Sequence, residues 1–323
     1  MSDRRGFFRD LLREAVGVAQ ELSANVQAAM EPDDEDRVFP TPAKAATAVV
    51  EEGTLLGLCF EVGLAHRADD VRGCARVSLR LTRGDAASRS RVGGVPEVPP
   101  GFVWPLRHGR ELGFLAQVDL AEVAAVDPET ILPRRGLMLF FYDLAERPSG
   151  LSPGDRGSCC VLVVDGDLRA AEAHAPALQA SPLELSRELM LPGAWSFQAE
   201  ELDLTYEERD AWDELRERLA RMQGVELEET SAGRIALHRL LGYHEEIGSE
   251  VEVDCALAAA GLDAGDIDFY GARRPAAEAD ARRWRPLLQV SAENSDVFER
   301  LYVLIRDGDL RTGTFGGAWA VCR

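Results

Sequence analysis

The sequence predicts an α+β protein with two related, mostly antiparallel β-sheet units, a helical middle segment and an N-terminal amphipathic helix. Short apolar runs bounded by Gly, Pro and Asp predict the strands. Two of these runs nearly repeat, VLVVDGDLRA at 161–170 and VLIRDGDLRT at 303–312. The helix signals lie before and between these two stretches, which separates the strands into two groups.

Length and charge limit the classes of protein to consider. The chain has 323 residues, 46% of them hydrophobic, and a formal net charge of −20. That length is enough for one large domain or two moderate ones. A charge of this sign repels phosphate backbones, so we expect no nucleic-acid partner, whereas a basic partner would be attracted.

Residues 1–30 form the first predicted segment, in which residues 3–30 make an amphipathic helix. Apolar residues recur there every three or four positions. Arginines crowd its first half, where positive charge opposes the helix dipole. Three interpretations stay open: the helix packs on its own domain, docks an unknown protein partner, or adsorbs to an anionic membrane. The predicted docking residues are Arg4, Arg5, Phe7, Phe8, Leu11 and Leu12.

The location of the protein is predicted from the same segment. DRRGFFRDLL at 3–12 is similar to a twin-arginine export motif, but Arg13, Glu14, Gln20 and Glu21 interrupt the apolar region that export requires. No apolar run reaches the length of a membrane span. We therefore expect a cytoplasmic protein, with peripheral membrane association as the alternative.

An acidic, proline-containing stretch at 31–42 predicts a linker, and residues 43–323 are predicted to form the main domain. Residues 45–82 mix helix and strand periods, although 71–83 alternates well enough to predict a strand. The segment 90–105 carries too many prolines and glycines for a helix or a central strand, so it predicts a loop.

Three apolar runs follow that loop and predict buried strands. They are ELGFLAQVDL at 111–120, which leads into a short helix, GLMLFFYD at 136–143 and SCCVLVVDGDL at 158–168.

Helix signals dominate the middle of the chain. Thr205 and Glu208 fit a capping box, which predicts a helix that runs to about Met222 before Gly224. A second helix is predicted over Ser231–Leu241. The chain then returns to strands, predicted at 285–290, 299–310 and 316–322.

The two Asp-Gly-Asp motifs, at 165–167 and 307–309, raise the question of metal binding. A calcium loop needs further ligands at fixed positions, and neither motif is followed by them. Asp-Gly after an apolar strand is instead typical of a hairpin turn, because Gly accepts positive φ. We predict turns here, and not metal or acid/base sites.

Six cysteines are scattered along the chain and none forms a CxxC pair, so the sequence predicts free, mostly buried thiols. His238 and His244 do not have the spacing of a zinc helix. The stretch around His244 is predicted to be a solvated loop. No phosphate-cradling loop or nucleophile elbow occurs, so we expect no cofactor and no metal.

Residues 90–143 resemble the YwqG-like family, bacterial proteins grouped as a domain of unknown function. The resemblance rests on Gly93-Gly94-Val95-Pro96, Trp104-Pro105, FLAQVDL at 114–120 and Leu132-Pro133 before FFYD at 140–143. Further similarity lies in HRLLGY at 238–243, WRPLLQV at 284–290 and the C-terminal LYVLIRDGDL. The resemblance covers about residues 90–323 and implies a mixed α+β fold without an established activity.

This chain departs from the family pattern at three places. Val297-Phe298-Glu299-Arg300 stands where the family tends to carry Trp-Gly-Asp before its last Tyr strand. Ser291-Ala292-Glu293-Asn294 stands where the family carries acidic residues, and His244 follows Gly242-Tyr243 where the family usually has Pro. If the family's cleft uses those acidic residues, this member is altered or inactive.

Two glutamines in apolar strands are the main candidates for chemistry. A buried amide has to be hydrogen-bonded, so each glutamine either holds down neighbouring backbone or faces a polar ligand. The ligand hypothesis places Trp104, Gln117, Asp119, Tyr142 and Gln289 around one cleft. No catalytic residue is assigned. The sequence therefore predicts a non-enzymatic binding module with an N-terminal docking helix, and a hydrolase using Gln117, Asp119 and Gln289 is the alternative.

Overall fold

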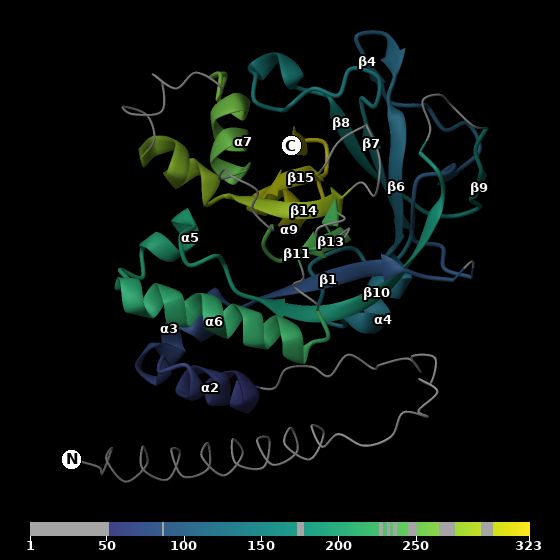
Figure 1. The fold of residues 1–323 in the computed structure, drawn as a ribbon. Coiled ribbons are helices and arrows are strands. Elements are labelled where there is room, and N and C mark those ends of the chain that lie inside the picture. Colours follow the sequence, from purple (N-terminus) through teal and green to yellow (C-terminus); the bar gives the residue numbers. More distant parts are fainter. Residues whose placement is uncertain are drawn as a thin grey trace. The chain divides into compact units, whose positions relative to one another are not determined.

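The computed structural model describes residues 52–85, 87–172, 178–225, 229–230, 233–234, 238–244, 251–264, 275–291 and 300–323. The described residues divide into two compact units, one within 1–76 and 188–227 and the other within 77–187 and 228–323. The first unit is helical and the second is built on a large sheet (Figure 1). The helix predicted at 3–30 and the linker at 31–42 lie outside the described residues, and a single domain from residue 43 remains a prediction.

The helical unit packs around a tryptophan. Trp212, Leu215 and Leu219 lie on one face of the longest helix and contact Leu55 and Cys59. The Trp212 indole nitrogen donates to the Pro192 carbonyl (2.9 Å), so its polar atom is satisfied inside the core. The helices of this unit are α2 (Glu52–Glu61), η1 (Ala65–Arg67), α3 (Ala68–Cys74), α5 (Phe197–Glu200) and α6 (Tyr206–Met222).

The start of α6 is fixed as the sequence predicts. The Thr205 hydroxyl accepts from the Glu208 backbone N–H (3.2 Å), and the Glu208 carboxylate accepts from the Thr205 N–H (2.8 Å). Gly224 follows the helix at φ 68°. The predicted capping box and the predicted end near Met222 are both confirmed.

The second unit contains a ten-stranded sheet with the order β16-β15-β14-β13-β1-β10-β2-β6-β7-β8. Each strand pair whose register is defined is antiparallel. The strands are β1 (Arg76–Arg83), β2 (Arg91–Val92), β6 (Gly113–Asp119), β7 (Leu137–Tyr142), β8 (Cys159–Val164), β10 (Ser181–Met190), β13 (His238–Leu241), β14 (Trp284–Ser291), β15 (Arg300–Arg306) and β16 (Trp319–Cys322). The predicted mixture of helices with an antiparallel sheet is confirmed.

The shorter elements of this unit lie outside the main sheet. The helices are α4 (Leu120–Val126), η2 (Pro153–Asp155), α7 (Val251–Ala259) and α9 (Asp307–Thr312). The small strand pairs are β3 (Glu97–Val98) with β9 (Arg169–Ala170), β4 (Leu106–Arg107) with β5 (Arg110–Glu111), and β11 (Glu229–Thr230) with β12 (Gly233–Arg234).

The sheet curls so that its two edges, β8 and β16, contact each other. The segment before β8 completes the closure. The Trp319 indole nitrogen donates to the Gly150 carbonyl (2.8 Å), and the Cys322 N–H donates to the Ser149 carbonyl (2.9 Å). These bonds give part of β16 the partners that an exposed edge strand would lack.

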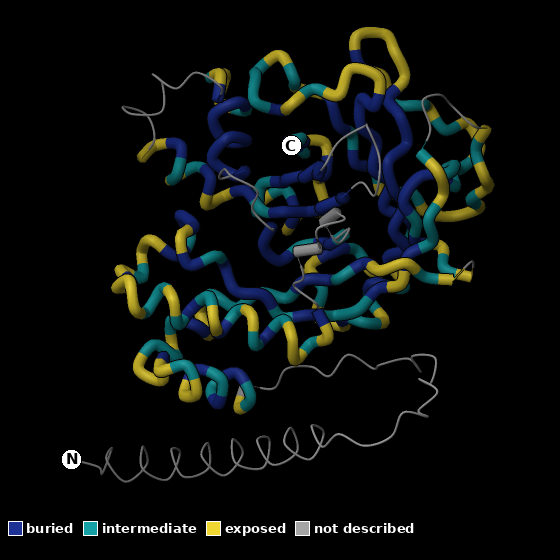
Figure 2. Tube along the Cα trace, viewed as in Figure 1, coloured by how far each residue is buried: buried dark blue, intermediate teal, exposed yellow. Residues whose placement is uncertain are grey.

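All ten strands contribute to one apolar core on the inner face of the sheet. On β7 the alternate residues Met138, Phe140 and Tyr142 point into this core, while Phe141 packs on the outer face with loop side chains. Burial on both faces explains the continuous apolar run at 137–142. Figure 2 shows these strands as buried, with exposed residues in the loops. Each large apolar side chain buried in this way contributes about 1.5–3 kcal/mol.

The two halves of the sheet have matching registers. Gln117 of β6 pairs with Arg91 of β2, and Gln289 of β14 pairs with Arg239 of β13. In the order of the strands, β2-β6-β7-β8 at one end mirrors β13-β14-β15-β16 at the other.

The backbone also matches between the halves. Gly93 and Gly94 follow β2 with φ values of 67° and 75°, and Leu241 and Gly242 end β13 with φ values of 60° and 74°. Only Gly adopts this conformation without strain, so Leu241 is held there against its intrinsic preference.

Several local predictions are wrong in whole or in part. Arg91–Val92, in the segment predicted to be a loop, forms β2 between β10 and β6, and the first residues of the strand predicted at 71–83 belong to α3. The helix predicted at Ser231–Leu241 is not formed, because His238–Leu241 is a strand paired on both sides, with β1 and β14. The second Asp-Gly-Asp is no turn either, since Asp307–Thr312 forms α9 and Gly313 takes the left-handed position at its end. The chain bends at Gly166 (φ 101°), but it forms no hairpin there because β9 pairs with β3 and not with β8.

The close approach of Gly150 to β16 predicts that adding one methyl group at this residue lowers the stability of the protein. A Cβ at Gly150 would overlap the Ala320 carbonyl oxygen, and φ is 78° there. We expect Gly150→Ala to lower the free energy of unfolding by at least about 3 kcal/mol, since overpacking adds to the left-handed penalty. Gly157 has φ 79° and nothing near its Cβ position, so Gly157→Ala should lose only about 1–2 kcal/mol. Equal losses in urea unfolding would show that the close approach is unimportant.

Candidate functional site

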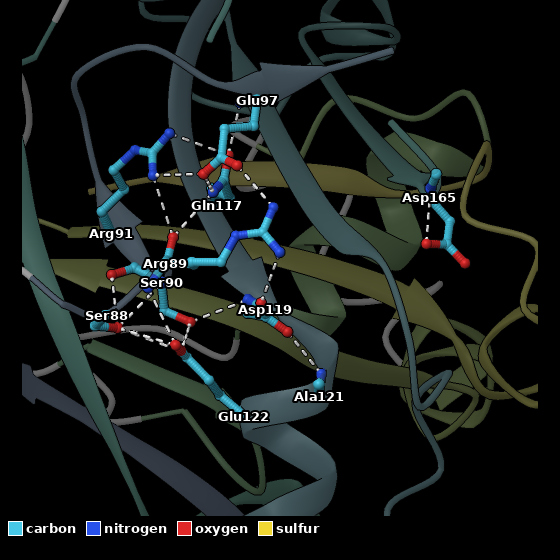
Figure 3. A network of polar contacts seen from close by, with 11 residues as sticks. Ser88, Arg89, Ser90, Arg91, Glu97, Gln117, Asp119, Ala121, Glu122 and Asp165 are labelled. Carbon is cyan, nitrogen blue, oxygen red and sulfur yellow. Dashed lines mark hydrogen bonds and ion pairs between the residues drawn. The ribbon is translucent and has the colours of Figure 1, made fainter. Parts of the chain in front are cut away.

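A network of polar side chains joins the segment 88–97 to β6 (Figure 3). At its centre lies Gln117, which is fully buried. Its Oε1 accepts from the Glu97 N–H (2.8 Å) and from Arg91 (3.3 Å), and its Nε2 donates to the Arg89 carbonyl (2.9 Å) and to the Glu97 carboxylate (3.0 Å). These four contacts use the full hydrogen-bonding capacity of the amide.

Arg89 links two carboxylates on opposite sides of the network. One of its terminal nitrogens donates to Glu97 (2.7 Å) and the other to Asp119 (3.3 Å). Arg91 also donates to Glu97 (3.3 Å) and to the Val95 carbonyl (2.5 Å). Glu97 therefore receives charge-assisted bonds from two guanidinium groups.

Asp119 and Glu122 hold the other end of the network. Asp119 is the N-cap of α4, where its Oδ1 accepts from the Ala121 N–H (2.8 Å). The buried Ser90 hydroxyl donates to Glu122 (2.5 Å) and accepts from the Asp119 N–H (3.0 Å). Glu122 also accepts from the Arg89 N–H (3.1 Å), so the network fixes the loop backbone as well as its side chains.

The electrostatics of the network keep Glu97 ionised. Burial raises the pKa of this carboxyl, but hydrogen bonds from Arg89, Gln117 and Arg91 outweigh burial and hold it below its ordinary value. In return, the Glu97 carboxylate raises the pKa of Arg89 despite desolvation. The groups stabilise each other's charges, and neither is poised for proton transfer near neutral pH.

This arrangement supports a structural role better than a catalytic one. The Ser90 side chain is buried and its proton points at Glu122, so it is shielded from a substrate. The side chain of Arg89 is 46% exposed and is the group of this network most open to a ligand. The network connects a proline- and glycine-rich loop to the sheet, where loop backbone needs partners.

The structure brings together two of the five predicted ligand-binding residues. Gln117 and Asp119 share Arg89. Trp104 lies on the same face of the sheet but packs edge-on against Phe141 (5.1 Å between ring centroids), and its indole nitrogen donates to the Leu112 carbonyl (2.7 Å).

The other two residues lie elsewhere. Tyr142 points into the inner core, and its hydroxyl donates to the Pro148 carbonyl (2.6 Å). Gln289 belongs to β14, which is separated from the strand of Gln117 by β13, β1, β10 and β2. The structure thus brings Gln117 and Asp119 together and places Tyr142 and Gln289 apart from them.

His238 and Ser291 repeat, in the second half of the sheet, a contact of the first half. The Ser291 N–H donates to the His238 Nδ1 (3.2 Å), as the Asp119 N–H donates to the Ser90 hydroxyl. The bond assigns the proton of neutral His238 to Nε2. Burial lowers the pKa of His238 to about 4, so the ring is neutral at physiological pH.

His244 is not in a solvated loop, contrary to the sequence-based prediction. It is buried, its Nδ1 lies 2.9 Å from a Glu252 carboxylate oxygen of α7, and its ring contacts Tyr302 edge-on at 5.6 Å. The sequence misled here because the partner comes from a helix further along the chain. The acidic residues that follow His244 lie outside the described residues.

Within the described ranges, no group of three or more His, Cys, Asp or Glu side chains is arranged to hold a metal ion. No helix in that part of the chain is both long and apolar enough to cross a membrane. All six cysteines are free, and Cys159 and Cys160 point to opposite faces of β8, as the sequence predicts. Burial raises the pKa of the Cys159 thiol to about 12, so it stays protonated.

Sequence reasoning missed the partners of Gln117. Arg89, Arg91 and Glu97 flank Gly93-Gly94 in the sequence SRSRVGGVPE. Two arginines and a glutamate on either side of a Gly-Gly pair are the sequence signal that could have predicted this network. The predicted docking residues at the N-terminus lie outside the part of the chain that the structure describes.

Fold and network together define an α+β protein with a curled, mostly antiparallel sheet. Its buried Gln117 holds the Gly-Gly loop, the segment 89–97 that contains Gly93 and Gly94. The chain belongs to a family described as a domain of unknown function (DUF1963), whose sequence profile matches residues 90–323. This match spans the same residues as the resemblance found in the sequence. No curated protein matches the chain.

The network predicts that Gln117 acts on stability. Gln117→Leu leaves the Glu97 N–H and the Arg89 carbonyl without their partner, and an unsatisfied buried group costs about 1–3 kcal/mol. We expect urea unfolding to show a loss of about 2–4 kcal/mol, together with faster amide exchange at Glu97. The same substitution at the exposed Gln179 should stay within about 0.5 kcal/mol. Unchanged stability of the Gln117 variant would contradict the structural role.

His238 predicts a pH dependence with a defined sign. The unfolded ring titrates near 6.5 and the folded ring near 4, so the unfolded state binds more protons between these values. Stability is therefore full above pH 6.5 and falls by at most about 1.4 kcal/mol per pH unit from 6.5 down to 4. His238→Asn keeps an acceptor near the Ser291 N–H but does not titrate. The difference between the two unfolding curves should appear only in that window, and parallel curves would contradict the assignment.

Proposed function

We propose that this chain is a non-enzymatic interaction module that binds a basic protein segment through its helical unit. The observation that carries this proposal is an exposed aromatic pair. The side chains of Trp195 and Tyr206 are 57% and 78% exposed, and their ring centroids lie 5.7 Å apart. Large aromatic side chains exposed together are typical of binding surfaces and rare elsewhere.

The aromatic pair is held in place before any partner arrives. The Arg209 guanidinium lies over the Trp195 ring, 4.6 Å from its centroid, and donates to the Ala194 carbonyl. The Ser196 hydroxyl donates to the Gly193 carbonyl (2.7 Å), which closes the turn that carries the tryptophan. A surface fixed in this way loses little conformational entropy on binding. Trp, Tyr and Arg are also the residue types that contribute most to binding energy in interfaces.

The charge around the pair favours a basic partner. The described part of this unit carries fourteen carboxylates and seven arginines. The exposed ones include Glu207, beside Tyr206 in the chain, and Asp210, one helical turn further along α6. Arginine or lysine of a partner would pair with these carboxylates and stack on the aromatic rings.

The N-terminal segment has a related place in this proposal. Arg4, Arg5, Phe7, Phe8, Leu11 and Leu12 make residues 3–13 both basic and apolar. We propose that this segment is a docking element for a further partner. Adsorption to an anionic membrane is the alternative occupant, and the acidic-aromatic surface of the chain itself is a third.

A hydrolase that uses Gln117, Asp119 and Gln289 is less well supported. The Gln117 amide is used in hydrogen bonds to the loop. Gln289 lies on β14, which four strands separate from β6 in the order of the sheet. We therefore assign Gln117 and Asp119 to holding the Gly-Gly loop, with the exposed Arg89 as the group most open to a ligand.

We also propose that the two halves of the sheet are an internal repeat in a YwqG-like, cytoplasmic bacterial protein. Three correspondences support the repeat: the Arg–Gln strand pairs, the consecutive positive φ angles after each arginine, and the side-chain acceptors at Ser90 and His238. Two joined copies of one unit would form a single sheet with mirrored strand order, as is found here.

The binding surface predicts a loss of affinity on removal of its aromatic rings. A photoreactive residue at position 206 of the full chain, expressed in the native host, would cross-link the bound partner for identification. With that partner purified, Trp195→Ala should weaken binding at least about 30-fold, and raised salt should weaken binding to the intact chain. Phe60 is exposed in α2 of the same unit, and Phe60→Ala should stay within about threefold.

Different cross-linked products separate the alternatives. A basic protein whose affinity depends on Trp195 supports the proposal. An acidic partner, or equal affinity of the Trp195→Ala chain, contradicts it. Cross-links to residues 1–30 of the same chain would replace it with internal docking, and cross-links to lipid would replace it with membrane association.

A further inference from the structure

An arginine-lined pocket lies in the second unit, next to the second Asp-Gly-Asp motif. Its volume is about 430 Å³, within the range of small-molecule sites. The lining residues are Arg282, Arg283, Arg285, Arg306, Asp307, Gly308 and Asp309. Four guanidinium groups against two carboxylates make this pocket positive in a chain whose net charge is −20.

Two strands and a helix bring these residues together. Trp284 and Arg285 begin β14, which pairs with the end of β15 in the register Trp284–Arg306. The Asp307 N–H donates to the Arg283 carbonyl (2.7 Å), which joins the start of α9 to the residue before the strand. Arg285 and Arg306 therefore lie on paired strands, and the three lining residues from Asp307 to Asp309 lie on α9.

The guanidinium of Arg306 is held in one orientation. It donates to both carboxylate oxygens of Asp280 (2.9 and 3.0 Å) and lies over the Trp284 ring, 4.6 Å from its centroid. A guanidinium has five N–H donors, so about three remain after this pair. Pairing that fixes an arginine without using all its donors prepares it to recognise an anion.

Arg285 and Arg283 offer further donors. The Nε of Arg285 donates to Asp307, and among the described residues its two terminal nitrogens make no hydrogen bond or ion pair. The Arg283 side chain is 75% exposed and reaches Asp280 only at 3.9 Å. Asp280 and Asp307 thus accept from arginines. The remaining N–H groups of these arginines are available to bind an anion.

The remaining wall has a different character. In the part of the chain that the structure describes, the Asp309 carboxylate makes no hydrogen bond or ion pair. A carboxylate cannot accept from an anion, but it accepts well from hydroxyl groups. The volume is also larger than a bare phosphate requires.

We propose that this pocket binds a phosphorylated polyol or sugar, with the phosphate on Arg283, Arg285 and Arg306 and a hydroxyl on Asp309. The phosphate carries more negative charge than a single carboxylate and accepts several N–H bonds at once, which matches three guanidinium groups. This site lies in a different unit from the aromatic pair and does not depend on the protein-binding function.

The test uses the intact chain with glucose 6-phosphate, inorganic phosphate and glucose as calorimetric probes. Glucose 6-phosphate should bind saturably, at least about tenfold more tightly than phosphate, and glucose should not bind detectably. Asp309→Asn should remove the preference for the sugar phosphate while phosphate still binds. Equal affinity for the two anions in the unaltered chain would overturn the role of Asp309.

Two glycines provide a matched pair of charge variants. Gly308 lines the pocket, Gly316 does not, and both have open space at the Cβ position. Gly308→Glu should weaken glucose 6-phosphate binding at least about tenfold, and Gly316→Glu should stay within about threefold. Saturable binding that Gly308→Glu leaves unchanged, or no binding of either anion to the intact chain, would overturn the proposal. Circular dichroism of each variant confirms that it is folded.

Discussion

The curl of the ten-stranded sheet, which brings its edge strands β8 and β16 into contact, is the constraint on which the rest of the second unit depends. This curl places the inward side chains of every strand in one core, and loop segments such as 93–96 lie outside the strand pairs of the sheet. Those loops carry backbone groups that need partners away from the sheet. Gln117 supplies such partners to the Gly-Gly loop, so a polar residue in an apolar strand follows from the architecture.

Strands buried on both faces were the elements that the sequence predicted best. The strands at 114–119 and 137–142 are buried at every position, and the apolar but partly exposed run at 159–164 forms the edge strand beside them. The sequence pattern of each run marks it without reference to distant residues. The strand His238–Leu241 was mistaken for a helix because it is short and its pairing with β1 and β14 comes from sequence far away. The second Asp-Gly-Asp motif was mistaken for a turn for a related reason. Its residues form the start of α9, which contacts β15 and ends at Gly313.

The candidate sites were harder to predict than the strands, because their residues meet only through the fold. The segment around Arg89 reaches Gln117 across about 20 to 30 positions, and no local period marks that contact. Trp195 belongs to a turn, where composition gives no sign that an indole stays exposed. The run Arg282-Arg283-Trp284-Arg285 was visible, but its meaning depends on Arg306, which strand pairing brings opposite.

The two proposed binding surfaces carry opposite charge, and the range of electrostatic forces explains how one acidic chain accommodates both. At physiological ionic strength the screening length is about 8 Å. A ligand in the arginine pocket therefore responds mainly to the pocket walls, whereas most of the −20 charge is screened from it. A basic segment approaching the aromatic pair meets the exposed carboxylates of Glu207 and Asp210 on α6. Local arrangement of charge, and not net charge, then decides which ligand each surface selects.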